Sequence, residues 1–133
     1  MDRERLAAGL GIAAAALVLF LTALPYAFAQ PEPIGTYYGV GLAGPAFVSL
    51  LSVAAAVTLL AAVTRRSDPA LASGVAVTVG AFAVVLSLLW AAPAGEVVSG
   101  IPVPAWFELH PASFVVATLV LVAASGLYAR TVL

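Results

Sequence analysis

The residues best suited to chemistry in this sequence form the tripeptide Glu108-Leu109-His110. In an extended segment, side chains two positions apart point the same way, so Glu108 and His110 could share a metal ion with Glu96 or Glu32. One histidine in a chain without cysteine is a poor ligand set, however. We therefore expect no metal site, and we interpret the pair as a solvated carboxylate beside a histidine at the membrane interface.

Catalysis has equally little support in the sequence. No Ser–His–Asp arrangement is recognisable for a nucleophilic mechanism. The long apolar stretches contain no Asp, Glu, Lys, Arg or His, whereas proton relays and ion-coupled carriers depend on such groups at membrane depth. We expect no catalytic residue, no bound cofactor and no enzymatic activity.

Composition defines the environment of the chain. Of the 133 residues, 64% are hydrophobic and only 8% are charged, whereas roughly a quarter of the residues in a soluble domain are charged. The absence of cysteine excludes a disulfide scaffold, and a net charge of −1 does not favour nucleic-acid binding. The composition predicts an integral membrane protein.

Four stretches are long and apolar enough to cross a bilayer as helices, which takes about 20 residues each. They cover residues 6–29, 46–63, 70–92 and 112–128. Their residues do not alternate in polarity as the strands of a transmembrane barrel do. The expected fold is an all-α membrane protein, a single domain over residues 1–133 that forms an antiparallel four-helix transmembrane bundle with two outer loops.

Proline residues mark the expected helix ends. Three of them stand where a helix should begin, since the first turn has no partner for the N–H that proline lacks: Pro45, Pro69 and Pro111. Pro93 is expected to follow the third span. Pro25 lies inside the first span, where it should free the carbonyl of Leu21 and kink the helix.

Arginine supplies every basic charge, and with four spans all arginines fall on the side of the two termini: Arg3, Arg5, Arg65, Arg66 and Arg130. The positive-inside bias places both termini in the cytoplasm, and we expect the protein in the plasma membrane. Arg65 and Arg66 are interpreted as topology determinants that also attract anionic lipid headgroups. Aromatic side chains are expected near the interfaces: Tyr128 at the inner one, and Tyr26, Trp90 and Trp106 at the outer one.

An alternative interpretation removes the first span. Ala27-Phe28-Ala29 resembles a signal-peptidase site. However, the segment Asp2-Arg3-Glu4-Arg5 is neutral rather than positive, and the apolar run exceeds the usual signal core of about 7–15 residues. We therefore expect the span to be retained.

Small residues recur at four-residue spacing in three spans: Ala7, Gly11 and Ala15; Ala54, Thr58 and Ala62; and Ala72, Ala76 and Gly80. Such rows let helix backbones approach closely where lipid provides no hydrophobic drive for association. We interpret them as packing surfaces within the bundle; the alternative is that one row faces a partner subunit.

The two outer loops differ in character. Residues 30–44 contain four glycines and should form tight turns rather than a regular element, with Tyr37 and Tyr38 as interfacial anchors. Residues 93–111 are unusually apolar, so this loop should fold over the outer end of the bundle, lie among headgroups or be covered by a partner. The candidate residues for an outer-face interaction are Tyr37, Tyr38, Trp106, Glu108 and His110.

Several short motifs support a family resemblance: Leu24-Pro25-Tyr26, Gly35-Thr36-Tyr37-Tyr38-Gly39, Gly44-Pro45 and Asp68-Pro69-Ala70. With these motifs the chain resembles small, uncharacterised four-span membrane proteins of haloarchaea over nearly its whole length. The resemblance implies an archaeal plasma-membrane protein and transfers no catalytic or binding residue.

The sequence favours a non-enzymatic accessory or structural subunit of a larger membrane assembly. Its expected partners are membrane lipids and other membrane subunits or further copies of itself, and nucleic acid is not among them. The alternative is a self-assembling pore or small-solute facilitator lined by serine and threonine hydroxyls. A third hypothesis is an outer-face binder that uses Tyr37, Tyr38, Glu108 and His110.

Overall fold

The computed structural model describes residues 2–133, and this part of the chain folds into helices with no β-strand. The four long helices are α1 (Arg3–Ala23), α3 (Pro45–Val63), α4 (Pro69–Val97) and α5 (His110–Val132). The shorter elements are the helix α2 (Pro31–Tyr38) and the 3₁₀ helices η1 (Leu24–Ala27), η2 (Val98–Gly100) and η3 (Ala105–Leu109). The prediction of an all-α four-helix bundle is confirmed.

The long helices, with their adjoining 3₁₀ turns, form four segments that are long and apolar enough to cross a membrane: Arg3–Ala27, Pro45–Val63, Pro69–Gly100 and Ala105–Val132. Helix α4 alone has 29 residues, which gives a length of about 44 Å. Because the hydrocarbon core of a bilayer is about 30 Å thick, the ends of α4 reach beyond it into the headgroup layers.

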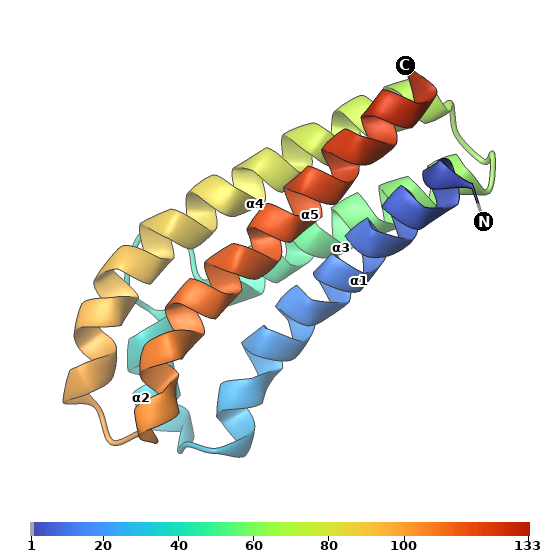
Figure 1. The fold of residues 1–133 in the computed structure, drawn as a ribbon. Coiled ribbons are helices and arrows are strands. Elements are labelled where there is room, and N and C mark those ends of the chain that lie inside the picture. The colour runs from blue at the N-terminus through green and yellow to red at the C-terminus, as the bar shows by residue number, and fades with distance from the viewer. Residues whose placement is uncertain (1) are drawn as a thin grey trace.

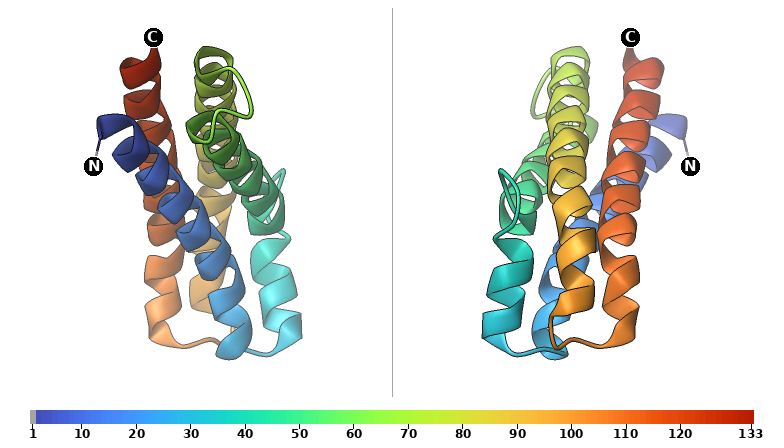
Figure 2. Two further views of the ribbon diagram at one scale, coloured as in Figure 1. Left: turned by 90° about the vertical axis from the view of Figure 1, so that its right-hand side faces the viewer. Right: turned by 90° about the vertical axis from the view of Figure 1, so that its left-hand side faces the viewer.

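The bundle has four corners, with α1 and α4 at opposite corners and each packed against both α3 and α5. Figures 1 and 2 show both chain ends and the turn between α3 and α4 at one end of the bundle, which we call the terminal end. The elements η1, α2, η2 and η3 lie at the opposite end, the loop end. Neighbouring long helices therefore run antiparallel.

Helix α2 occupies the corner that the shorter α3 leaves open at the loop end. It lies beyond the N-terminal end of α3 and contacts α4 and η1 (Figures 1 and 2). The prediction that residues 30–44 contain no regular element is wrong for Pro31–Tyr38. Proline in the first helical turn costs no hydrogen bond, and Ile34 and Tyr37, three positions apart on one face, are buried in the bundle. This burial compensates for the low helix propensity of Gly35.

The prediction that Pro93 follows the third span is also wrong, because α4 continues through Pro93 to Val97. Proline provides no N–H for the carbonyl of Leu89, four residues earlier. Gly41, with a φ of 77°, packs directly against this turn, and a Cβ at Gly41 would lie 2.9 Å from the Leu89 carbonyl oxygen. The connection between α2 and α3 thus uses glycine to bring its backbone onto the interrupted turn of α4.

Small side chains are frequent where the long helices pack against each other, and many large apolar side chains face outward, as expected for a lipid environment. Two of the predicted small-residue rows are buried between the helices: Ala7, Gly11 and Ala15 on α1, and Ala72, Ala76 and Gly80 on α4. The row on α3 does not pack in this way, because Ala54 is exposed and Thr58 is only half-buried. On that helix Ser52, Ala55 and Leu59 form the inward face instead.

The close contact at Gly80 predicts a position-specific packing effect. A Cβ at Gly80 would lie 3.3 Å from the Cα of Val122 on α5, whereas nothing lies within 4 Å of a Cβ at Gly74. We expect Gly80→Leu to force α4 and α5 apart and to lower the free energy of unfolding by about 1–3 kcal/mol. Gly74→Leu, on an exposed face of the same helix, is the matched control and should leave stability unchanged or raised. Equal melting temperatures for the two variants in detergent would contradict this packing.

Candidate functional site

The loop end contains a buried group of aromatic side chains around the single histidine, which we call the His110 cluster: Tyr37, Tyr38, Trp90, Phe107, His110 and Phe114. These residues come from α2, α4, η3 and α5. Tyr38 is half-buried, and the other members are at most 2% exposed. The cluster therefore joins α2, α4, η3 and α5 at the loop end.

The imidazole of His110 bridges two other segments of the chain. Its Nε2 lies 2.6 Å from the carbonyl oxygen of Leu21, and its Nδ1 lies 2.7 Å from the hydroxyl of Tyr37. Because a carbonyl can only accept, Nε2 must carry the hydrogen, and Nδ1 then accepts a hydrogen bond from Tyr37. Both ring nitrogens are thus used in structural hydrogen bonds.

The Leu21 carbonyl is available to His110 because of Pro25. In a regular helix this carbonyl would accept from the N–H of residue 25, which proline lacks. Helix α1 ends at Ala23 and continues as the 3₁₀ helix η1, in which Pro25 is buried. The carbonyl freed by Pro25, as the sequence predicts, therefore finds its donor on α5.

The two tyrosines of α2 extend this network to α4 and α1. The indole N–H of Trp90 donates to the backbone carbonyl of Tyr37 over 3.0 Å. The hydroxyl of Tyr38 donates to the carbonyl of Thr22, and the Thr22 hydroxyl lies 2.7 Å from the hydroxyl of Ser49 on α3. Throughout residues 2–133, every buried side-chain nitrogen or oxygen has a hydrogen-bond partner.

Burial changes the acidity of the α2 tyrosines. Desolvation raises the pKa of Tyr37 well above its usual value of 10.0, and the neighbouring Tyr38 raises it further. Desolvation likewise raises the pKa of Tyr38, with a smaller contribution from Tyr26. Both hydroxyls therefore stay protonated and remain hydrogen-bond donors over the physiological pH range.

The structure separates the residues predicted to share an outer-face role. Glu108 and His110 do not lie in an extended segment, because Glu108 is in η3 and His110 begins α5. Glu108 is exposed, whereas His110 and Tyr37 are buried and closed off from an outer surface, which corrects their assignment as outer-face residues. Trp106 is partly exposed and packs edge-on against Phe28, with ring centroids 5.3 Å apart.

Two of the aromatic side chains predicted near the membrane interfaces, Trp90 and Tyr128, are fully buried within the bundle. Trp90 is part of the His110 cluster, with its ring centroid 5.1 Å from that of Tyr37 and 6.0 Å from that of His110. The sequence signal that could have located this cluster is Pro25, because a freed carbonyl inside a span requires a donor from elsewhere.

The acidic residues at the loop end do not assemble into a site. Glu32, Glu96 and Glu108 are all exposed. In the part of the chain that the structure describes, no three His, Cys, Asp or Glu side chains are grouped so that they could hold a metal ion. The side-chain contacts at the loop end hold the helices together, and these three carboxylates do not point toward a common site.

At the terminal end, Arg65 contributes to the tertiary structure. Its guanidinium makes two contacts with the carboxylate of Glu4 on α1, at 2.9 and 3.1 Å, and the hydroxyl of Tyr128 on α5 lies 3.3 Å from the same carboxylate. Arg65 thus joins the α3–α4 turn to α1. Both Arg65 and Arg66 are exposed, but within residues 2–133 only Arg65 has an ion-pair partner. Of the pair predicted to attract lipid headgroups, Arg65 is therefore engaged by the protein itself.

The backbone of Arg65 explains how it reaches Glu4. Arg65 has a φ of 61°, and its N–H donates to the carbonyl of Ala62 while that of Arg66 donates to Ala61. This is a Schellman motif, in which the left-handed position is usually glycine. Arginine is unfavourable there by about 1–2 kcal/mol, and the two-contact ion pair offsets part of that cost.

Four apolar helices, packed through small residues and closed by hydrogen bonds at the loop end, define a multi-pass membrane protein. Over residues 1–133 the sequence matches a family described as "Family of unknown function (DUF7548)", and the chain belongs to that family. Comparison with curated proteins and with solved structures gives no match.

The hydrogen bond between Tyr37 and His110 can be tested by removing one hydroxyl. Tyr37→Phe would leave the buried Nδ1 of His110 without a donor, which should lower the free energy of unfolding by about 1–3 kcal/mol. Tyr26→Phe is the matched control, because Tyr26 is 57% exposed. Equilibrium unfolding in mixed micelles measures both variants, and equal stabilities would mean that the bond contributes nothing.

The raised pKa values of Tyr37 and Tyr38 predict a loss of stability in alkali. In the unfolded chain both tyrosines ionise near 10.0, whereas in the folded protein they remain neutral. The unfolded state therefore binds fewer protons above pH 10, and stability falls as pH rises, by up to about 1.4 kcal/mol per pH unit for each tyrosine. The double variant Tyr37→Phe, Tyr38→Phe should show a shallower decline between pH 10 and 11 in the same assay. Parallel pH profiles for the variant and the wild type would refute this assignment.

Proposed function

We propose that the chain is a non-enzymatic accessory or structural subunit of a larger membrane assembly. The observation that supports the proposal is a contrast: the polar side chains of the interior are all hydrogen-bonded within the described residues, whereas the exterior is apolar. Inside residues 2–133, buried polar side chains are bonded to one another or to backbone carbonyls. Outside, leucine, valine and phenylalanine side chains are widely exposed along the long helices. The groups of this molecule that are available to bind a partner are therefore the apolar side chains on the outer faces of its long helices.

The role of His110 supports the absence of catalysis in this proposal. Histidine is the side chain best suited to proton transfer near neutral pH, and this chain contains one. Both nitrogens of that ring hold neighbouring segments of the fold, on Leu21 and Tyr37. A general base would need one nitrogen free to meet a substrate proton.

The alternative of a pore lined by hydroxyls has weaker support. Most of the hydroxyls that face the interior are committed to local or interhelical hydrogen bonds, such as the 3.0 Å contact between Ser87 and Thr118. A pore formed between copies of the chain would use outward hydroxyls such as Thr78 and Ser113, but these also donate to the backbone carbonyl four residues earlier. We retain it as the alternative that the experiment below distinguishes.

We place the protein in an archaeal plasma membrane with both termini in the cytoplasm. The support for this placement is the family resemblance and the position of every arginine at the terminal end. The outward apolar surface then contacts lipid and the other subunits of the assembly.

The test is to extract a tagged chain from its native membrane in mild detergent and to record a native mass with identification of each subunit. We expect a fixed stoichiometry with at least one different membrane protein. Tagged protein added to a solubilised extract of untagged cells is the control for association after extraction. Recovery of a monomer alone would contradict the accessory role, whereas a homo-oligomer that supports solute flux in liposomes would favour the pore.

A further inference from the structure

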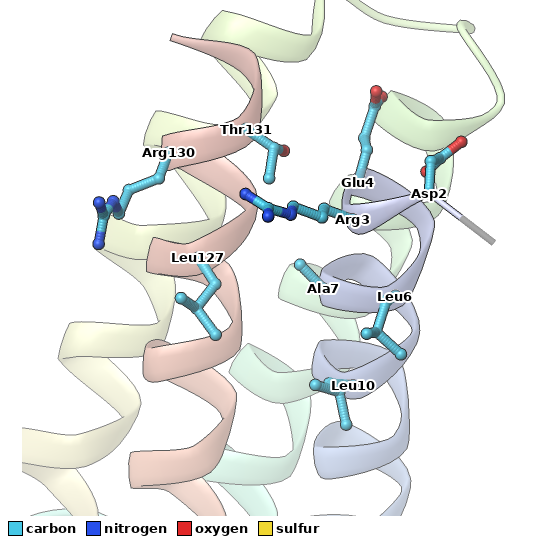
Figure 3. A pocket seen from close by; sticks show the side chains of 9 residues that line it. All are labelled: Asp2, Arg3, Glu4, Leu6, Ala7, Leu10, Leu127, Arg130 and Thr131. Carbon is cyan, nitrogen blue, oxygen red and sulfur yellow. The ribbon is translucent and has the colours of Figure 1, made fainter.

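A cleft of about 810 Å³ opens at the terminal end between α1 and α5. Its charged and polar lining is Asp2, Arg3, Glu4, Arg130 and Thr131, and its apolar lining is Leu6, Ala7, Leu10 and Leu127. The volume lies within the range of small-molecule sites, about 300–1,000 Å³. Figure 3 shows the side chain of Arg3 extending from α1 toward α5, with Leu127 projecting into the same space below it.

The charges around this cleft do not cancel. The carboxylate of Asp2 accepts a hydrogen bond from the backbone of Arg5 at 2.7 Å and lies 4.0 Å from its guanidinium. Glu4 is held by the two contacts from Arg65. Among residues 2–133, Arg3 and Arg130 form no ion pair, and both are exposed. Two guanidinium groups beside the cleft are therefore uncompensated: that of Arg3 extends from α1 toward α5, whereas that of Arg130 points from α5 away from α1 (Figure 3).

The order of these groups along the bundle matches that of a phospholipid. Arg3 and Arg130 stand at the end of the bundle, and the exposed side chains of Leu6, Leu10 and Leu127 follow toward its middle. In a membrane this order places positive charge at headgroup level and an apolar wall at the level of acyl chains. A soluble anion would match only the first part, and a neutral lipid only the second.

We propose that this cleft binds one anionic phospholipid. The phosphate contacts Arg3, and the exposed side chain of Arg130 turns from its outward position toward the cleft to contact the same phosphate, because guanidinium groups pair well with phosphate oxygens. One acyl chain lies in the groove lined by the three leucines. The site differs from the Arg65–Arg66 pair, since Arg65 is already held by Glu4. The proposal does not depend on the accessory role or on which face of the membrane the terminal end occupies.

The electrostatic part is tested by native mass spectrometry of the full chain, delipidated in detergent and titrated with phosphatidylglycerol or phosphatidylcholine of identical acyl chains. We expect one phosphatidylglycerol to bind preferentially, and Arg3→Gln with Arg130→Gln to weaken this binding by about 30-fold. The matched control, Arg5→Gln with Arg66→Gln, removes the same charge from the same end and should bind nearly as the wild type does. Equal binding of phosphatidylcholine, or an equal loss in the control, would overturn the proposal.

A second test, of the apolar lining of the cleft, distinguishes binding of a lipid from binding of a free anion. Leu127→Ala retains both arginines and should weaken phosphatidylglycerol binding severalfold, whereas Leu119→Ala, at another exposed leucine of α5, should not. Inorganic phosphate alone should fail to compete with the lipid. Full competition by phosphate, or identical binding by the two leucine variants, would show that the cleft holds no acyl chain. The melting temperatures of the lipid-free variants should match that of the wild type, because these side chains are exposed.

Discussion

The hydrogen bond from His110 to the carbonyl of Leu21 satisfies the constraint that governs this fold. Inside a bilayer, each backbone carbonyl that leaves the helical pattern needs a donor from the protein itself. Pro25 creates such a carbonyl on α1, and the histidine that begins α5 supplies the donor. Because the other ring nitrogen accepts from Tyr37, the same side chain also fixes α2. Without this bridge, the break in α1 would leave an unpaired polar group at the centre of the loop end.

The same constraint accounts for the rest of the loop end. The hydroxyl of Tyr38 donates a hydrogen bond to the carbonyl of Thr22, one residue after Leu21 in α1. The indole N–H of Trp90 donates to the backbone carbonyl of Tyr37 in α2. Gly41 lets the next connection approach α4 where Pro93 interrupts it. Two proline interruptions at one end of the bundle are thus covered by a short helix and its flanking glycines. The terminal end needs no such cover, and it is held by the ion pair between Glu4 and Arg65.

The two ends of the molecule consequently differ in what they offer to other molecules. At the loop end most aromatic and polar side chains make contacts within the chain, and its surface presents exposed carboxylates together with Tyr26 and Phe28. At the terminal end the carboxylates of Asp2 and Glu4 are paired with arginines, and two further arginines remain beside an apolar cleft. The apolar helix faces between the ends provide the surface through which an accessory subunit would join an assembly.

The sequence by itself determined the class of fold, because lipid imposes a simple rule: apolar length and the absence of internal charge define spanning helices. It also located the helix starts at Pro45 and Pro69 and the break at Pro25, since proline acts on its own backbone. Only the tertiary structure decided where Tyr37, Trp90 and His110 lie and what they bind. Each of them has a hydrogen-bond partner at least 53 residues away in the sequence. Their types fit a membrane interface as well as a buried network, and it is the packing of α2 against α4 and η1 that selects the network. The same holds for Arg65 and Arg3: only the fold decides which arginine meets a carboxylate, because their pairing depends on how α1 crosses the α3–α4 turn.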